Sequence, residues 1–187
     1  ILAEFSEDTQ EKTDTVAHEV LVQLKDVGAT VEYITERKVM DAVWAVRRSS
    51  FRVLRDATFS NPQKRAVPCI EDIIVPIKNF DVFVPGLLGL LKKYELEYGF
   101  HGHIGDGALR VVPVFDFTHK DIALATTEEF MTDVFTLIKQ VRGNMSADHS
   151  DGLIRTPFLS MFYGETLYTE VIVAIKKLFD PYNIFNP

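Results

Sequence analysis

A glycine-rich stretch between two strand-like segments constrains the fold of this chain more than any other feature. Residues 100–110 read FHGHIGDGALR and contain three glycines, two histidines, an aspartate and an arginine. Glycine tolerates positive φ and lets a backbone turn sharply or approach a ligand closely. An Asp-Gly pair between strand-like flanks is a strong hairpin signal. We therefore predict strands at 97–103 and 108–115, joined by a turn at Gly105-Asp106-Gly107.

The spacing of apolar residues predicts further helices and strands around this hairpin. Helical periodicity predicts a first helix that follows capping residues at 6–9 and ends near 27, before a glycine. The same periodicity predicts further helices at 36–55, 79–95, 126–143, 153–163 and 165–179. Pro85 is expected to kink its helix. Short apolar runs predict strands at 1–5, 29–34 and 71–76, with a loop at 56–68. Strand–helix–strand passages indicate an α+β fold, in which a ferredoxin-like, mainly antiparallel sheet has helices on one face, followed by a C-terminal helical segment.

The composition excludes several classes of function. The 187 residues carry a formal net charge of −7 and no run of lysines or arginines, which speaks against nucleic-acid binding. Cys69 is the single cysteine, so cysteine-ligated zinc or iron–sulfur sites within this chain are excluded. We expect a cytoplasmic protein, because the sequence shows neither a signal-peptide profile nor an apolar run of about 20 residues. The edges at Ile1 and Pro187 suggest a piece of a longer polypeptide.

A second polar stretch offers the same residue types as the glycine-rich one. Residues 146–152 read SADHSDG and follow a predicted helix. We expect the two stretches to meet and form one pocket. In it, His103, Asp106, Asp148 and His149 would suit a borderline metal or proton transfer. The alternative is that the histidines are structural and that Asp106 only supports its turn.

Five short motifs occur in order along the chain: Trp44–Arg47, Glu71–Pro76, His103–Gly107, Ser146–His149 and Phe179–Pro187. They resemble, in that order, the patterns W-x-x-R, E-D-V-A-V-P, G-H-x-G-D-G-N-x-H, S-x-E-H and F-D-P-x-x-I-x-N-P. These patterns are those of the C-terminal cap domain of the FAD-linked oxidase family, which includes glycolate oxidase, D-lactate dehydrogenase and D-2-hydroxyglutarate dehydrogenase. The resemblance spans nearly the whole chain.

This resemblance implies that residues 1–187 are the cap domain of a longer polypeptide whose FAD-binding domain lies outside this chain. Such an enzyme oxidises a 2-hydroxy acid of the D-lactate or glycolate type, passing a proton to a base and a hydride to the flavin. By motif position, His149 is the catalytic base and lies near the flavin, Arg47 binds the substrate carboxylate, and Asn186 approaches the flavin. Imidazole is a suitable base near neutral pH, and a guanidinium binds a carboxylate at two points.

Three departures from the family's pattern change the expected metal site. Relatives carry a second histidine at the position of Arg110, an asparagine at Ala108 and a glutamate at Asp148. In these relatives the two histidines and the acid hold a divalent metal. Here His103 and Asp148 remain as metal-ligand candidates, whereas an arginine has no lone pair to donate. We therefore predict weak or absent metal binding. Our hypothesis is that Arg110 replaces the metal's charge, pairing with Asp148 in the empty pocket and with the substrate's carboxylate or hydroxyl in the occupied one.

Two other functions stay open from the sequence. The same enzyme family acting on a dicarboxylate or a bulkier anion is one, and a non-catalytic α+β ligand-binding module is the other. A glycine-rich phosphate-binding loop upstream of Ile1 would favour the enzyme.

The sequence also indicates partners. Residues 146–157 resemble the large family members that are fused to iron–sulfur segments, so such clusters would lie outside this chain. The expected partners are therefore the hydroxy acid, the FAD-binding domain and an electron acceptor or iron–sulfur segment. Attachment to the membrane periphery through that acceptor is the alternative location. In the isolated fragment, we expect the uncovered apolar face of the sheet to favour a homodimer.

Overall fold

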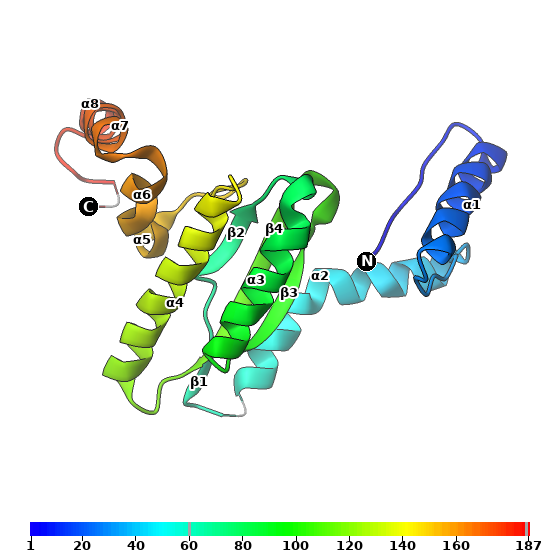
Figure 1. The fold of residues 1–187 in the computed structure, drawn as a ribbon, viewed down its shortest axis with the longest axis horizontal. Coiled ribbons are helices and arrows are strands. Elements are labelled where there is room, and N and C mark those ends of the chain that lie inside the picture. The colour runs from blue at the N-terminus through cyan, green and yellow to red at the C-terminus, as the bar shows by residue number, and fades with distance from the viewer. Residues whose placement is uncertain (60, 186) are drawn as a thin grey trace. The chain divides into compact units, whose positions relative to one another are not determined.

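A computed structural model describes residues 1–59, 61–185 and 187, and it divides the chain into two compact units. The first unit is Ile1–Ser50 and the second is Phe51–Pro187, and each is described by itself. The first unit contains helix α1 (Gln10–Asp26) and the beginning of helix α2 (Arg37–Phe59) (Figure 1). Within the described part of the chain, no helix is both long enough and apolar enough to cross a membrane.

The first unit confirms its predicted helices but not its predicted strands. The hydroxyl of Thr9 accepts a hydrogen bond from the backbone N–H of Lys12 at the start of α1, and Gly28 follows the helix with a φ of +79°. The strands predicted at 1–5 and 29–34 are wrong, because both segments lack regular structure. The described strands of the sheet all belong to the second unit, and an isolated strand leaves its backbone groups unpaired.

The second unit is built on an antiparallel sheet of β1 (Lys64–Ala66), β2 (Ile70–Ile74), β3 (Glu97–His103) and β4 (Ala108–Asp116). Strand β4 is central. It pairs with β3 over its length on one side, while β2 and β1 pair with successive parts of its other side. The predicted hairpin is confirmed, with a 3₁₀ turn at Ile104–Asp106 between its strands. The α+β class and the mainly antiparallel sheet are therefore confirmed.

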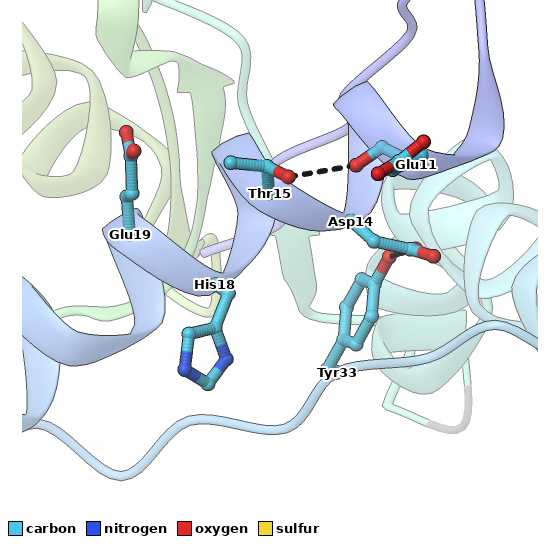
Figure 2. Close-up of a pocket in the computed structure, with 6 residues that line it drawn as sticks. All are labelled: Glu11, Asp14, Thr15, His18, Glu19 and Tyr33. Carbon is cyan, nitrogen blue, oxygen red and sulfur yellow. Dashed lines mark hydrogen bonds between the residues drawn. The ribbon is translucent and has the colours of Figure 1, made fainter.

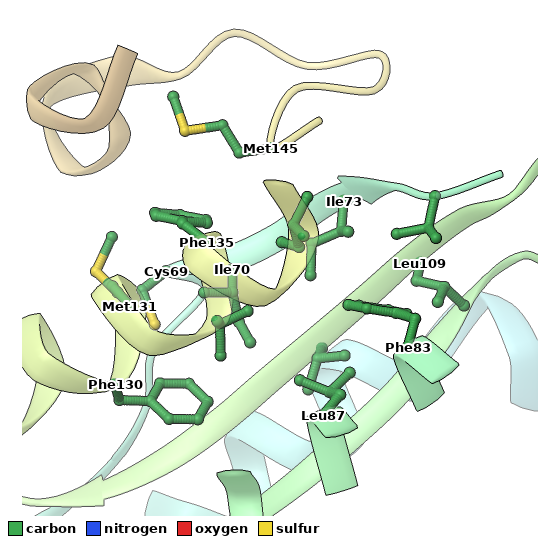
Figure 3. Close-up of a cluster of buried hydrophobic side chains, with 14 of the residues drawn as sticks. Cys69, Ile70, Ile73, Phe83, Leu87, Leu109, Phe130, Met131, Phe135 and Met145 are labelled. Atoms are coloured by element: carbon green, nitrogen blue, oxygen red, sulfur yellow. The ribbon is translucent and has the colours of Figure 1, made fainter. Parts of the chain in front are cut away.

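Two helices, α3 (Phe80–Lys93) and α4 (Lys120–Gln140), cover one face of this sheet (Figure 1). Their buried side chains join those of β2 and β4 in one core, which Figure 3 shows; it includes Ile70, Ile73, Phe83, Leu87, Leu109, Phe130 and Phe135. Helix α3 continues through Pro85, and α4 begins six residues before the predicted start. The thiol of Cys69 belongs to this core, and its burial raises the pKa of Cys69 to about 12.

The other face of the sheet is partly covered by the end of α2. A Cβ at Gly99 of β3 would lie 2.7 Å from the Leu54 side chain of α2. Gly99 pairs with Val112, which lies next to the core residue Val111 on β4 and so points to the other face of the sheet. The predicted loop at 56–68 therefore contains the last turn of a helix and the short strand β1.

Short helical segments follow the polar stretch at 146–152. They are α5 (Gly152–Arg155), a 3₁₀ turn at Thr156–Phe158, α6 (Leu159–Tyr163), α7 (Glu165–Leu167), a π-helical turn at Tyr168–Ile172 and α8 (Val173–Phe179). Phe158 packs against Phe135 of α4 with ring centroids 4.9 Å apart. The C-terminal helical segment is thus present, although a π-helical turn interrupts the predicted helix at 165–179.

Gly107 is required by the turn of the hairpin, and its replacement is expected to be costly. Its φ is +76°, and a Cβ there would lie 2.2 Å from the carbonyl oxygen of Val75. We expect Gly107→Ala to lower the free energy of unfolding by at least about 1–2 kcal/mol, the cost of a left-handed L-residue before any steric overlap. Urea unfolding followed by hydrogen exchange of β3 and β4 peptides measures this. Gly105→Ala is the matched control, because nothing lies within 4 Å of a Cβ there. An equal loss in both variants would contradict the assignment.

Candidate active site

The candidate site starts from one charged residue in an apolar strand. Arg110 lies on β4 between the core residues Leu109 and Val111, and its cross-strand neighbour on β3 is His101. Side chains alternate along a strand, so Arg110 points to the sheet face opposite to α3 and α4. Its side chain is only 17% exposed. A buried guanidinium requires polar partners, and those partners come from the loop at 146–152.

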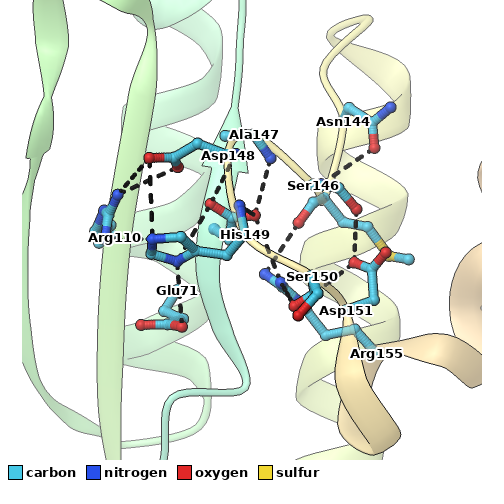
Figure 4. A network of polar contacts seen from close by, with 12 residues as sticks. Glu71, Arg110, Asn144, Ser146, Ala147, Asp148, His149, Ser150, Asp151 and Arg155 are labelled. Atoms are coloured by element: carbon cyan, nitrogen blue, oxygen red, sulfur yellow. Dashed lines mark hydrogen bonds and ion pairs between the residues drawn. The ribbon is translucent and has the colours of Figure 1, made fainter. Parts of the chain in front are cut away.

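Arg110 contacts two consecutive residues of that loop (Figure 4). Its Nη2 donates to both carboxylate oxygens of Asp148, at 2.9 and 3.2 Å. Its Nη1 lies 3.2 Å from Nε2 of His149. The Nε of Arg110 is buried and has no hydrogen-bond partner among the described residues. The structure therefore brings together Arg110, Asp148 and His149 from the two polar stretches.

The contact with Arg110 defines the chemical state of the His149 ring. Arginine can only donate hydrogen bonds, so Nε2 of His149 must accept in this contact. A neutral imidazole then carries its proton on Nδ1, where Oε1 of Glu71 and Oδ1 of Asp72 lie 3.7 and 3.8 Å away. The His149 side chain is 41% exposed. The arrangement presents one nitrogen lone pair beside one fixed positive charge, at an edge that solvent and a ligand can reach.

The loop is held in place by the carboxylate of Asp72, which is fully buried. Its oxygens accept the backbone N–H groups of Ala147, Asp148 and His149 at 3.0, 3.3 and 3.0 Å. Burial acts to raise the pKa of the Asp72 carboxyl, but these hydrogen bonds, that of His149 first, outweigh burial and lower the pKa below its ordinary value. Asp72 is therefore ionised in the folded protein near neutral pH.

Arg155 supplies the counter-charge behind Asp72. Its side chain is 4% exposed, and its guanidinium lies 3.5 Å from Asp72 and 3.4 Å from Asp151. It also donates to the backbone carbonyls of Met145 and Ser150 at 3.2 and 2.8 Å. Arg155 thus binds backbone carbonyls near both ends of the loop and Asp72 of β2 at the same time.

The metal role predicted for His103 and Asp148 stays a prediction, and the two side chains form no ion pair in the part of the chain that the structure describes. His103 is exposed at the end of β3, and its side chain makes no hydrogen bond or ion pair with the described residues. Among those residues, the one cluster with three ligand atoms close enough for a metal is Asp72, Asp148 and His149. Its oxygens and nitrogen already face backbone amides and the guanidinium of Arg110. A divalent metal needs ligands that offer lone pairs, whereas Arg110, which contacts Asp148 and His149, can only donate N–H groups. These residues therefore do not fit a metal.

Two further site predictions stay predictions. Arg47 is half-buried on α2 and belongs to the first unit, so its role as a carboxylate clamp rests on motif position alone. Asn186 lies outside the described residues.

The first unit has a pocket of its own, lined by Glu11, Asp14, Thr15, His18, Glu19 and Tyr33 (Figure 2). Tyr33 donates a hydrogen bond to Asp14 at 2.5 Å, which lowers the pKa of the Asp14 carboxyl. All of the lining side chains are exposed. Solvated charges of this kind are common on helix surfaces, and we assign this pocket no function.

Sequence reasoning did not assign site roles to Glu71, Asp72 and Arg155. The signal for Glu71 and Asp72 was available, because two carboxylates interrupt the apolar run from Cys69 to Val75. A buried carboxylate needs hydrogen-bond donors, so such a pair predicts a partner elsewhere in the fold. The sequence could not show which donors Asp72 binds, because those backbone amides lie more than 70 residues further along the chain.

The low pKa of Asp72 predicts a pH-dependent loop. A carboxyl whose pKa is lower in the folded state stabilises that state above its unfolded pKa of about 3.9, and the contribution disappears as the pH falls through the folded value. The urea concentration that removes hydrogen-exchange protection from peptides of β2 and residues 144–150 should therefore decrease as the pH falls below about 5. The decrease should be smaller in Asp72→Asn. An identical pH dependence in both proteins would contradict this account.

Comparison with known proteins agrees with this architecture. The family model described as "FAD linked oxidases, C-terminal domain" matches residues 1–187. The chain is 32% identical over 146 residues to a D-2-hydroxyglutarate dehydrogenase of Pseudomonas putida, and 28% identical over 148 residues to one of Haemophilus influenzae. These matches cover 78% and 79% of this chain but 14% of each relative.

A third relative, glycolate oxidase subunit GlcD of Bacillus subtilis, is 26% identical over 133 residues, which are 71% of this chain and 28% of that protein. The chain thus spans a small part of the length of the curated relatives that it matches. Its whole length nevertheless matches one family. The chain therefore belongs to the family of FAD-linked oxidase C-terminal domains.

Proposed function

We propose that this chain is the substrate-binding domain of a flavoprotein that oxidises a 2-hydroxy acid, and that FAD is bound mainly by a domain outside residues 1–187. The observation that carries the proposal is the contact between Arg110 and Nε2 of His149, at 3.2 Å. It places a fixed positive charge beside a proton-accepting nitrogen. Oxidation of a 2-hydroxy acid needs both, because the substrate carries a carboxylate and loses its hydroxyl proton.

In the proposed mechanism, the substrate carboxylate or hydroxyl oxygen takes the place of Asp148 and of Nε2 of His149 on the guanidinium of Arg110, which frees the lone pair of Nε2. The substrate hydroxyl then donates its proton to Nε2 of His149. The positive charge of Arg110 stabilises the negative charge that develops on the hydroxyl oxygen. When bound, FAD supplies the acceptor for the hydride that leaves C2, which yields the 2-oxo acid. The His149 side chain is 41% exposed, so a substrate and a bound cofactor could reach its ring.

The names of two relatives favour a dicarboxylic substrate. The two D-2-hydroxyglutarate dehydrogenases named above are matched over more than three quarters of this chain. A dicarboxylic substrate needs two cations. By motif position Arg47 would bind the carboxylate that all 2-hydroxy acids carry, and Arg110 is the further cation that a dicarboxylate would need. We therefore propose D-2-hydroxyglutarate as the first substrate to test, with D-lactate and glycolate as comparisons.

The visible absorption spectrum of the full native polypeptide tests this proposal. Flavin bands that bleach on anaerobic addition of one of the three hydroxy acids would support the enzyme and identify its substrate. An additional broad shoulder would reveal iron–sulfur clusters outside this chain. A colourless protein, or flavin bands that none of the three acids bleaches, would contradict the proposal, and the colourless protein would favour a non-catalytic ligand-binding module.

Arg110 is expected to control substrate affinity. We expect Arg110→Met to raise KM for the hydroxy acid about 10- to 100-fold, because a hydrogen-bonded charge contributes about 1.5–3 kcal/mol. The KM of Arg110→Lys should lie between those of the wild type and Arg110→Met, since lysine keeps the charge but loses the two-point geometry. Steady-state kinetics of the full native protein measure this. Arg65→Met is the control, because Arg65 is an exposed arginine on β1. An unchanged KM in Arg110→Met would rule out this role.

A further inference from the structure

Strand β2 carries an irregularity directly across from Arg110. Ile70 pairs with Val111 and Ile73 pairs with Leu109, so three steps along β2 match two steps along β4. The extra residue on β2 forms a β-bulge, and Glu71 and Asp72 lie in it. In a regular strand, two consecutive side chains point to opposite faces of the sheet. A bulge re-aims a side chain, and bulges occur often beside active sites.

The bulge allows two consecutive carboxylates to approach one atom. Oε1 of Glu71 lies 3.7 Å from Nδ1 of His149, and Oδ1 of Asp72 lies 3.8 Å from the same nitrogen. The other ring nitrogen, Nε2, faces Nη1 of Arg110 at 3.2 Å and Oδ2 of Asp148 at 3.9 Å. Acceptors therefore flank Nδ1, and the nearest group to Nε2 is an obligatory donor.

Asp72 and Glu71 act on His149 in different ways. Asp72 is fully buried and also binds the backbone N–H of His149, so it fixes the position of the residue as well as its ring. The Glu71 side chain is 33% exposed and makes no hydrogen bond with the described residues. Its approach to Nδ1 is its one ion-pair contact there, and Figure 4 shows its carboxylate beneath the imidazole. A merely structural role is thus available to Asp72 but not to Glu71.

We propose that Glu71 and Asp72 are positioning residues for His149. Asp72 fixes the backbone of residues 147–149, and both carboxylates together favour the tautomer with its proton on Nδ1. That tautomer leaves the lone pair on Nε2, which the proposed function needs as proton acceptor. The inference rests on that proposed function for its effect on catalysis, whereas its effect on the loop and the ring does not depend on it. The third group of a catalytic triad orients its histidine in the same manner.

Glu71→Gln tests the proposal in the full native flavoprotein, because glutamine keeps the shape of the side chain and removes its charge. We expect kcat to fall about 5- to 20-fold with KM unchanged, less than the loss of about 10⁴ that follows when a hydrogen-bonded triad carboxylate is replaced. Glu97→Gln is the matched control, since Glu97 lies on β3 of the same sheet, is 68% exposed and pairs with Lys64. Equal kcat values for Glu71→Gln and the wild type would overturn the positioning role of Glu71.

A second measurement does not depend on turnover. Diethyl pyrocarbonate modifies the imidazole lone pair, and mass spectrometry reads its rate at each histidine. The labelling is carried out at about pH 8.5, above the ordinary imidazole range, so that the rate reports the nucleophilicity of Nε2. We expect slower modification of His149 in Glu71→Gln, with exposed His18 of the first unit as the internal reference. An unchanged rate at His149 would overturn the proposal.

Asp72→Asn tests the backbone part, with hydrogen exchange of residues 147–149 as the readout. We expect these amides to exchange at least about 10-fold faster, while Asp116→Asn, which removes a carboxylate bound to Thr118, leaves them unchanged.

If Asp72→Asn does not fold, the two measurements on Glu71→Gln still test the proposal. If His149 itself proves dispensable for turnover, the proposed function fails, yet the labelling and exchange changes remain. If His149 is essential and these changes are absent, the positioning proposal alone fails.

Discussion

Replacing His149 with glutamine is expected to lower kcat of the full native flavoprotein by about 10²–10⁴-fold, the usual contribution of a general base. Glutamine keeps polar atoms near Arg110 but accepts no proton at neutral pH. KM should change little, because Arg110 and not His149 is proposed to supply the charge that binds the substrate's carboxylate or hydroxyl. Anaerobic stopped-flow measurement of flavin reduction isolates this step from reoxidation.

The control for this prediction is His18→Gln. His18 is an exposed histidine of α1 in the first unit, and its replacement should leave the rate of flavin reduction unchanged. A His149→Gln protein that reduces its flavin within about threefold of the wild-type rate would exclude His149 as the base.

Replacing Arg155 with methionine is expected to lower the free energy of unfolding by about 3–5 kcal/mol, the range measured when one partner of a buried ion pair is removed. The substitution leaves Asp72 with less compensation for its buried charge and leaves the carbonyls of Met145 and Ser150 without their donor. Urea unfolding, followed by hydrogen exchange of peptides from β2 and α4, measures the loss.

Lys93→Met provides the matched control. Lys93 pairs with Asp133 at 2.7 Å on the surface, where the two side chains are 60% and 36% exposed. Exposed ion pairs contribute about 0–1 kcal/mol, so this variant should lose no more than that. Similar losses in both variants would mean that the Arg155 network does not hold the loop.

Local signals in the sequence predicted the elements whose structure depends on nearby residues. The cap at Thr9, the glycine at Gly28 and the hairpin around Gly107 are of this kind, because turns and helix ends are determined by a few adjacent residues. The strand predicted at 29–34 failed because a strand also requires a partner, which the described part of the first unit does not provide. Apolar alternation alone does not supply one.

The candidate site was predictable only where a local motif marked its residues. Motif positions indicated Asp148 and His149, and the departure from the family's pattern indicated Arg110. The bulge that brings Glu71 and Asp72 to His149 depends on the register between β2 and β4, which no local pattern encodes. His103 was assigned to the metal site by its motif, but Arg110 occupies the position between the remaining ligand atoms. One substitution in β4 therefore changes what its neighbours can bind.

A structure of the full native protein, reduced and with D-2-hydroxyglutarate bound, tests the account most directly. We predict that a carboxylate or the hydroxyl of the ligand lies within hydrogen-bond distance of Arg110, that the contacts of Arg110 with Asp148 and with Nε2 of His149 are broken, and that Nε2 faces the hydroxyl oxygen. Anomalous scattering from the same crystals reports any metal. A hydroxy acid bound away from Arg110, or a stoichiometric metal held by His103 and Asp148, would contradict the account.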